Sequence, residues 1–219
     1  MTVIAIDGPA GAGKSTVARA VALRLGFEYL DTGAMYRTLA LAALEQKTDL
    51  EDEDALTELA KSIDIELEDD VVTLNGTDVS SAIRSDDVTA IVSKVAAVEG
   101  VRRAMAARQR ARAEGGNLVM EGRDIGSAVV PAADVKIFLT ASRDERAHRR
   151  ARQLGLATDE MSLEELARSI EQRDRADAER KASPFVRASD AVVVDSTGKD
   201  IGTVVEEIAT AARRAIDER

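Results

Sequence analysis

A glycine-rich segment that ends in a lysine and two hydroxyl residues lies close to the start of the chain. It fits G-x-x-x-x-G-K-S, the pattern of a phosphate-binding loop or P-loop, and runs Gly8, Pro9, Ala10, Gly11, Ala12, Gly13, Lys14, Ser15, Thr16. In this pattern the glycines let the backbone wrap around a phosphate that a Cβ atom would obstruct. The lysine reaches the β- and γ-phosphates, and the serine hydroxyl binds Mg²⁺. The segment therefore predicts a nucleoside triphosphate bound by Lys14, with Ser15 as a metal ligand.

The sequence on both sides of the segment supports this interpretation. Residues 3–6 form a short apolar run, which is typical of a buried parallel strand. After the loop, Val17, Val21 and Leu25 follow one another at helical spacing. The loop is thus expected to join a strand to the N-terminus of a helix, where free backbone N–H groups and the positive end of the helix dipole attract an anion.

Arginines occur in three groups along an otherwise acidic chain of 219 residues with a net charge of −10. The groups cover residues 102–112, 143–152 and 168–187. Most of these side chains are expected on solvated helix faces. A few guanidinium groups are expected to converge on small, highly charged phosphates. The overall negative charge argues against a long nucleic-acid partner.

Composition excludes several further classes of protein. Cysteine is absent and His148 is the only histidine, so disulfides, thiolate metal sites and multi-histidine metal sites are excluded. No apolar run approaches 18 residues, and Asp7 and Lys14 come too early for a signal peptide. We expect a soluble cytoplasmic protein whose core is aliphatic, because aromatic residues make up only 2% of the chain.

Apolar runs that alternate with helical patterns predict an α/β fold with a parallel sheet covered on both faces. Strands are expected at about 2–7, 27–30, 118–120, 135–139 and 191–195, and the segment at about 63–80 reads as a small antiparallel excursion with a turn at Asn75-Gly76. Ligands bind outside the carboxyl ends of the strands in such sheets. The P-loop and the polar segments 31–33, 121–124 and 195–196 all follow strands, which predicts one shared site.

Three classes of P-loop protein can be compared with the sequence. A signalling GTPase needs N-K-x-D, which does not occur, and the D-x-x-G match at 195–198 comes too late to be a switch. An ATPase motor needs an apolar strand that ends in an acid, for which 118–121 is a loose candidate in a short chain. A phosphotransferase needs a second anionic pocket and a mobile cover, and the arginine groups can supply both. The third class is favoured.

Four further motifs resemble those of the bacterial cytidylate kinases. They are D-T-G-A-M-Y-R at 31–37, E-G-R-D-I-G at 121–126, K-I-F-L at 136–139, and the arginines and aspartates of 172–180. The resemblance runs nearly the full length of the chain, in the same order. It implies a three-layer P-loop NTPase fold with a central parallel sheet, a monophosphate-binding insert and a lid. It also implies the reaction of ATP with CMP or dCMP in the presence of Mg²⁺, by a monomer.

The resemblance further implies one P-loop kinase domain with three regions. The core is expected at about 1–32, 115–145 and 180–219, the monophosphate-binding region at about 33–114, and the lid at about 146–172. In the lid, Arg149 is expected to close over the phosphates of the donor. This closure would exclude water that could otherwise hydrolyse ATP.

The same resemblance assigns roles on the acceptor side. The arginines at motif positions that hold the acceptor phosphate are Arg37, Arg123 and Arg180, while Arg173 and Asp177 are placed near the ribose. Ser93, Arg102 and Asp124 match the positions that contact cytosine. A guanidinium facing O2 and N3 and an acceptor facing the N4 amino group favour cytosine over uracil. Thr32 stands where family members often have serine, and it keeps the hydroxyl.

Catalysis of this kind depends on neutralisation and alignment of charge rather than on a general base, because the attacking phosphate is already largely ionised at pH 7. We therefore read His148 as an ordinary helix residue. Two alternatives stay open at this stage. One is a kinase for UMP or another small metabolite that uses the same phosphate contacts. The other is a nucleotide-binding regulator without turnover.

Overall fold

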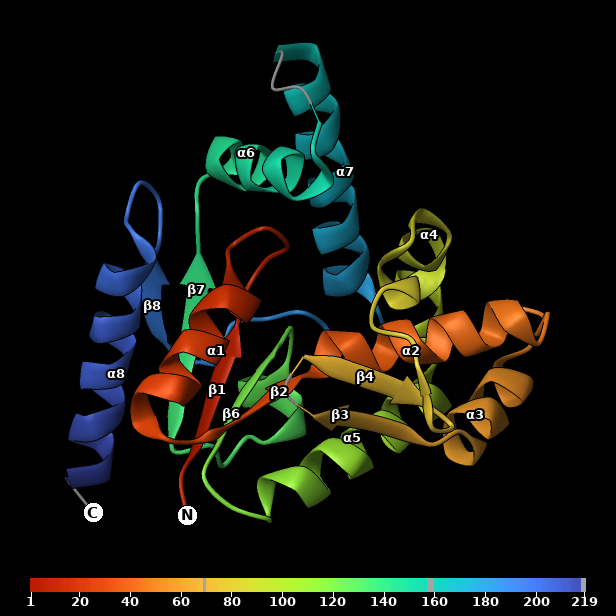
Figure 1. The fold of residues 1–219 in the computed structure, drawn as a ribbon, viewed down its shortest axis with the longest axis horizontal. Helices are drawn as coiled ribbons and strands as arrows, with labels where there is room; N and C mark the ends of the chain where they lie inside the picture. Colours follow the sequence, from red (N-terminus) through yellow and green to blue (C-terminus); the bar gives the residue numbers. More distant parts are fainter. Residues whose placement is uncertain (69, 157–159, 218–219) are drawn as a thin grey trace. The chain divides into compact units, whose positions relative to one another are not determined.

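The computed structural model describes residues 1–68, 70–156 and 160–217, and the chain divides into two compact units (Figure 1). The first unit comprises residues 1–29, 116–179 and 183–219. The second comprises residues 30–115 and 180–182. The chain leaves the first unit after residue 29 and returns to it at residue 116. Residues 180–182 form a second, short excursion into the second unit.

A five-stranded sheet organises the first unit, in the order β2-β6-β1-β7-β8. The central strand β1 (Val3–Asp7) pairs in parallel with β6 (Leu118–Gly122) and with β7 (Val135–Thr140). Strand β7 in turn pairs in parallel with β8 (Val192–Asp195), and β2 (Glu28–Asp31) lies next to β6 at the other edge. The predicted α/β fold with a central parallel sheet is confirmed.

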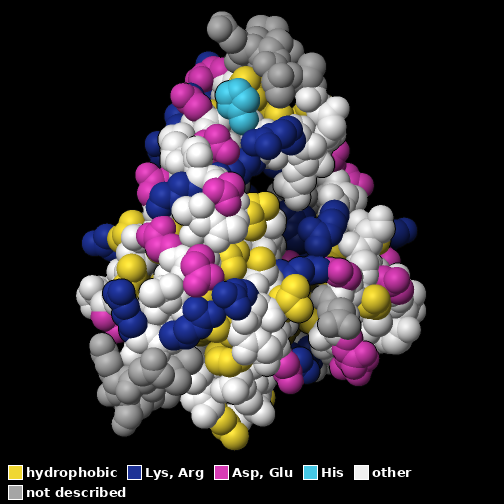
Figure 2. Space-filling view, turned by 60° about the vertical axis from the view of Figure 1, so that its left-hand side comes forward, with side chains coloured by type: hydrophobic (Ala, Val, Ile, Leu, Met, Phe, Trp, Pro, Cys, Tyr) yellow, Lys and Arg dark blue, Asp and Glu magenta, His cyan; other side chains and the backbone are white. Residues whose placement is uncertain are grey.

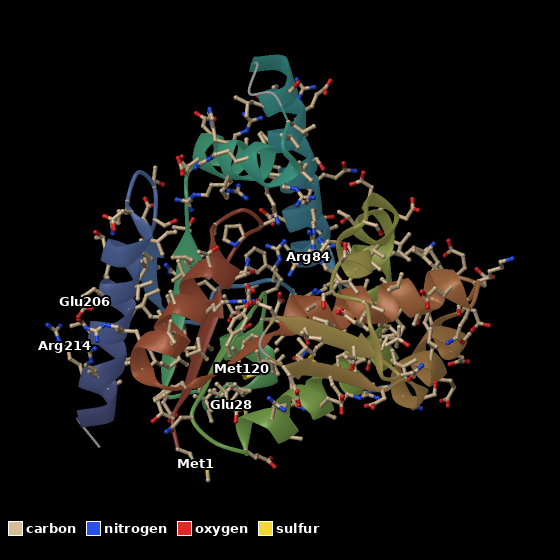
Figure 3. All side chains as sticks on the ribbon, in the orientation of Figure 1. Met1, Glu28, Arg84, Met120, Glu206 and Arg214 are labelled. Atoms are coloured by element: carbon tan, nitrogen blue, oxygen red, sulfur yellow. The ribbon has the colours of Figure 1, made fainter. Side chains whose placement is uncertain are left out.

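Two helices cover one face of this sheet, α1 (Lys14–Leu25) and α8 (Ile201–Asp217). Their apolar side chains, including Val21 and Ile208, pack with strand residues into one aliphatic core. Met120, labelled in Figure 3, is a fully buried residue of β6. The outer face of α8 is charged, and its Glu206 forms ion pairs with Arg24 and Arg213.

Two arginine-rich helices of the first unit lie along the predicted lid, α6 (Arg143–Leu154) and α7 (Glu160–Glu179). Arg143 joins them, because its guanidinium pairs with Glu164 and Glu171 at 2.8 Å each. Hydrogen bonds from Arg143 and Arg168 lower the pKa of Glu164 to about 2. Residues 157–159 of the expected lid lie outside the described part of the chain.

The second unit contains the predicted antiparallel excursion as a small three-stranded sheet. Its strands are β3 (Ile65–Glu68), β4 (Val71–Leu74) and β5 (Thr77–Asp78), paired in that order. Asn75 and Gly76 connect the last two strands with φ angles of 50° and 79°. Two successive positive φ values are what a tight hairpin turn requires, and Asn-Gly adopts them readily.

The helices of the second unit begin at side-chain caps where the sequence provides them. Asp31, Asp52 and Ser85 each accept a backbone N–H of the first helical turn, which stabilises the helix start. The helices are α2 (Thr32–Glu45), α3 (Glu53–Ser62), α4 (Asp86–Val95) and α5 (Glu99–Ala113).

Two short elements were not predicted from the sequence. They are a 3₁₀ turn, Ala82–Arg84, in the second unit and a π-helical segment, Ile125–Val129, in the first. Neither carries the periodicity that identifies longer helices. In the described residues, no helix combines the length and the apolar character needed to cross a membrane.

Gly8 provides a test of how closely the P-loop packs on the sheet. A Cβ atom at this position would lie 2.0 Å from the carbonyl oxygen of Leu139 in β7. Because a backbone atom cannot rotate away, we expect Gly8→Ala to lower the free energy of unfolding by about 2 kcal/mol or more. Gly116→Ala is the matched control, since a Cβ there meets no atom within 4 Å. Equal denaturant midpoints for the two variants would contradict this packing.

Candidate active site

The P-loop connects β1 to α1 in the first unit, as the sequence predicts. Gly11 and Gly13 have φ angles of 76° and 91°, which L-residues with a side chain rarely adopt. Gly13 is the N-cap of α1, and no side chain caps the helix or adds an acid to its first turn. The N-terminal N–H groups of α1 are therefore left for an anionic ligand.

Lys14 lies over this loop and donates a hydrogen bond from its Nζ to the carbonyl of Pro9 at 2.9 Å. Removal from water, followed by repulsion from the Arg123 guanidinium, lowers the pKa of Lys14 to about 8. The Glu121 and Asp174 carboxylates oppose this shift. A phosphate placed beside the ammonium group would reverse the shift, because an opposite charge favours the protonated form.

Asp7 ties the start of the P-loop to the segment that follows β6. Its two carboxylate oxygens accept the backbone N–H groups of Ile125 and Gly126, each at 2.8 Å. Burial raises the pKa of Asp7 to about 6, although both hydrogen bonds oppose the shift. This tie fixes the neighbouring Arg123 and Asp124 beside the loop. Sequence reasoning gave Asp7 no such role, although its place directly before the glycines was the available signal.

Arg123 brings the P-loop and α7 together. Its Nη1 atom donates to the carbonyl of Gly8 at 3.1 Å and to the Asp174 carboxylate at 2.7 Å. Its Nη2 atom lies 3.1 Å from an oxygen of Asp177, and the guanidinium carbon stands 5.0 Å from the centre of the Phe185 ring. Two residues of the predicted set, Arg123 and Asp177, are thus in direct contact.

Arg173, one helical turn before Asp177, is a partly buried cation close to Arg123 and to the carboxylates of Asp174 and Asp177. Its Nε atom is buried and has no hydrogen-bond partner. Burial, together with the nearby Arg123 cation, lowers the pKa of Arg173. A guanidinium that is desolvated next to another cation is expected to bind an anionic ligand tightly, because the ligand offsets the repulsion between the two cations.

Two arginines of α6 contact the carbonyl groups of the P-loop. Arg149, which was predicted to lie over the donor phosphates, donates to the carbonyl of Ala12 and to both the hydroxyl and the carbonyl of Ser196, each at 2.9 Å. Arg146 donates to the carbonyl of Ala10 at 3.2 Å and to Asp174 at 2.5 Å. Ser196 follows β8 in a segment that the sequence predicted at the shared site. Sequence reasoning assigned no individual role to Arg146 or Asp174, because no spacing along the chain reveals these contacts.

In the second unit, one face of α4 gathers three predicted residues. Arg37 on α2 donates to Thr89 of α4 at 2.9 Å, and Arg102 on α5 donates to the carbonyl of Ala96 at the end of α4 at 3.3 Å. Positions 89, 93 and 96 lie on the same side of a helix. Ser93 therefore stands between the contact points of the two arginines. Arg102 is buried, with its guanidinium carbon 5.5 Å from the centre of the Tyr36 ring.

The other predicted residues have simpler settings. Thr32 is buried in the first turn of α2, and Asp124 is buried in the segment after β6. Arg180 directly follows α7 and belongs to the second unit. The predicted acceptor residues are consequently divided between the units, with Arg123, Asp124, Arg173 and Asp177 in the first and Thr32, Arg37, Ser93, Arg102 and Arg180 in the second.

The donor set suits Mg²⁺ bound together with a nucleotide. In the part of the chain that the structure describes, no group of three or more His, Asp or Glu residues is arranged to hold a metal ion. Mg²⁺ does not need such a group, because it keeps several waters and is commonly bound through one or two protein ligands plus substrate phosphates. The Ser15 side chain is exposed in the first turn of α1, and its hydroxyl is a suitable oxygen ligand.

His148 lies on the surface of α6, among acidic and basic side chains (Figure 2, cyan). Its Nδ1 atom is 2.8 Å from the carbonyl oxygen of Asp144 in the preceding turn. It touches none of the P-loop residues named above. This placement agrees with the reading of His148 as an ordinary helix residue.

A pocket of about 500 Å³ in the second unit does not coincide with the predicted site. It lies between β3 and the C-terminal half of α5, with Leu30 and Met35 at its wall. None of its lining residues belongs to the predicted set. This pocket therefore does not mark the residues that the sequence predicts for the site.

The chain is similar to known proteins over nearly its full length. The family model described as cytidylate kinase matches residues 4–214. A cytidylate kinase of Bacillus cereus (strain B4264) is 51% identical over 209 residues, which cover 94% of this chain and 93% of that protein. A cytidylate kinase of Bacillus thuringiensis (strain Al Hakam) is 50% identical with the same coverage.

Solved structures share the fold at low sequence identity. An uncharacterized protein from Eubacterium ventriosum superimposes with a TM-score of 0.53 at 12% identity, with all of both chains covered. A gluconokinase from Sinorhizobium meliloti gives a TM-score of 0.50 at 16% identity, covering 99% of this chain and 94% of that one. These similarities concern the arrangement of the strands and helices alone.

The pKa of Lys14 predicts how nucleotide binding depends on pH. A pKa of about 8 makes Lys14 mostly protonated at pH 7 and mostly neutral at pH 9 in the free protein. A bound phosphate is expected to raise this pKa back towards its ordinary value, because an opposite charge favours the protonated form. The dissociation constant of ATP should therefore rise roughly tenfold from pH 7 to pH 9. Calorimetric titration at each pH measures it, and Lys14→Arg, which does not titrate in this range, is the control. A constant affinity across the range would contradict the lowered pKa.

Proposed function

The chain belongs to the cytidylate kinase family, and we propose that it transfers the γ-phosphoryl group of ATP to CMP or dCMP through the residues described above. The observation that supports this most directly is the cation cluster of the first unit. Lys14 has a lowered pKa, and Arg173 is desolvated beside Arg123 with its buried Nε atom not hydrogen-bonded. Such a site is suited to substrates that carry several negative charges.

The charge of the reactants explains why so many cations are needed. A triphosphate and a monophosphate together bring about five or more negative charges into one site at pH 7. Transfer then requires that these charges are neutralised and that the attacking oxygen is aligned with the phosphorus and the leaving oxygen. The monophosphate is already ionised and needs no general base. The surface position of His148 is compatible with this mechanism.

On the donor side, we assign the phosphates of ATP to the backbone N–H groups of residues 8–16 and to Lys14. Ser15 would hold Mg²⁺, which when bound neutralises charge on the phosphate oxygens. Arg149 is already anchored to the carbonyl of Ala12 and to Ser196. We assign Arg149 to the lid, where it holds the P-loop through the carbonyl of Ala12 and would lie close to the donor phosphates.

On the acceptor side, we assign the phosphate to Arg37, Arg123 and Arg180, because planar guanidinium groups bind phosphate oxygens in pairs. The ribose is assigned to Arg173 and Asp177. The ion pair between Arg123 and Asp177 supports a common role for these two residues. In the second unit, the contact of Arg37 with Thr89 fixes the orientation of its guanidinium.

The base is assigned to three groups with complementary hydrogen-bonding character. Arg102 would donate to O2 and N3 of cytosine, while Asp124 would accept from the N4 amino group, with Ser93 as a further polar contact. Uracil reverses the character of N3 and of position 4, so a buried guanidinium and a buried carboxylate would each lose a partner. A site of this kind discriminates by several kcal/mol. The burial of Arg102 and Asp124 supports such discrimination.

Production of ADP tests the proposed reaction against its alternatives. With ATP and Mg²⁺, we expect strong turnover with CMP and dCMP, weak turnover with UMP, and little with AMP. Lys14→Ala is the negative control and should abolish transfer while the protein stays folded, as judged by circular dichroism. Turnover that prefers UMP would indicate another acceptor, and no acceptor-dependent turnover at all would indicate a nucleotide-binding regulator.

Asp124 provides a separate test of base recognition. We expect Asp124→Ala to lower kcat/KM for CMP by at least a hundredfold, because the N4 amino group loses its acceptor, while the affinity for ATP stays within about threefold. Steady-state kinetics with CMP and UMP, together with titration of ATP alone, measures both effects. The assignment is wrong if ATP binding and CMP turnover fall by equal factors.

A further inference from the structure

The carboxylate of Asp174 occupies a place in the P-loop that is built for an anion. Its Oδ1 atom accepts the backbone N–H of Ala10 at 3.0 Å and the Nη1 of Arg123 at 2.7 Å. Its Oδ2 atom accepts the Nη1 of Arg146 at 2.5 Å. A backbone N–H of the glycine-rich loop and two guanidinium groups are the donors that a phosphate takes up at such a site.

The same two arginines also hold the backbone of the loop. Arg123 donates to the carbonyl of Gly8, and Arg146 donates to the carbonyl of Ala10. The Asp174 carboxylate therefore completes a closed set of contacts in which α6, α7 and the loop are fixed to one another within the first unit.

Asp174 is distinguished from its neighbour Asp177 by its contact with the loop. Asp177 pairs with Arg123 from the next turn of α7, and its carbonyl accepts the N–H of Phe185. The Asp174 carboxylate accepts a backbone N–H of the P-loop from α7. It also supports the protonated form of Lys14.

We propose that Asp174 is an internal anion that substitutes for a nucleotide phosphate in the free enzyme and competes with it during binding. The inference rests on the proposed function, since it names the group that the phosphates of ATP displace. In the free enzyme the carboxylate offsets the positive charges of Arg123 and Arg146 and holds the backbone of the loop through the N–H of Ala10. When ATP binds, its phosphate oxygens take over the N–H of Ala10 and the guanidinium of Arg146, and Arg123 is released for the acceptor phosphate. Asp174 is thus a positioning residue.

The proposal predicts effects of opposite sign in one variant. Asp174→Asn keeps the shape of the side chain but removes its charge. Without nucleotide, the melting temperature should fall, because Arg123, Arg146, Arg173 and Lys14 lose their shared counter-ion. The affinity for ATP should rise about tenfold, because a charge-assisted competitor has been removed. If Asp174 had a purely structural role, its substitution would lower both the melting temperature and the affinity for ATP.

The experiment compares the wild-type protein, Asp174→Asn, Asp174→Glu and Asp190→Asn by titration with ATP and Mg²⁺ without acceptor, and by thermal melting. Asp174→Glu retains the anion and should bind ATP within about threefold of wild type. Asp190→Asn is the matched control, since Asp190 forms a 2.7 Å ion pair with Lys136 and should leave the ATP affinity unchanged. Unchanged or weaker ATP binding by folded Asp174→Asn would overturn the proposal.

A second measurement serves if the Asn variant does not fold. In a crystal structure of the wild-type protein with a non-hydrolysable ATP analogue, a phosphate oxygen should accept the N–H of Ala10, with the Asp174 carboxylate moved out of hydrogen-bonding distance. A carboxylate that stays on Ala10 would overturn the proposal. Failure of the wild-type protein to bind ATP would instead contradict the proposed function, so the two failures are distinguishable.

Discussion

Accumulated positive charge at the P-loop is the constraint on which the rest of the site depends. Lys14, Arg123 and Arg173 lie close enough for Arg123 to lower the pKa of both other groups. Without phosphate such an arrangement is unfavourable, and the carboxylates of Asp174 and Asp177 offset part of the repulsion. The remaining repulsion between these cations is relieved when a multiply charged anionic substrate binds. Phosphoryl-transfer sites combine tight binding with charge neutralisation in this way.

The parallel sheet makes this concentration of charge possible. The carboxyl ends of β1, β6 and β8 lie at one edge, so the P-loop, Arg123 and Ser196 are neighbours although they are far apart in sequence. The buried carboxylate of Asp7 then fixes the segment after β6 through two backbone N–H groups. An aliphatic core under α1 holds the loop in place.

In the second unit, the residues that we propose for recognition of the acceptor are anchored to α4 rather than to the sheet. Arg37 and Arg102 come from two other helices, and each is anchored to α4 on the face that carries Ser93. The anchoring bonds restrict long side chains that would otherwise lose much rotamer freedom on binding a ligand.

The sequence by itself determined the local elements and the identity of the chemistry. The glycine pattern predicted the P-loop between β1 and α1, the alternating apolar runs predicted the parallel sheet, and Asn75-Gly76 predicted the hairpin, because these features depend on neighbouring residues. The motifs also selected Arg123 and Asp177, which the structure places in contact. The contacts of Asp7, Arg146 and Asp174 were decided only by the tertiary structure. Each joins groups more than a hundred residues apart, or on separate helices, and side-chain spacing along one element carries no information about such pairs.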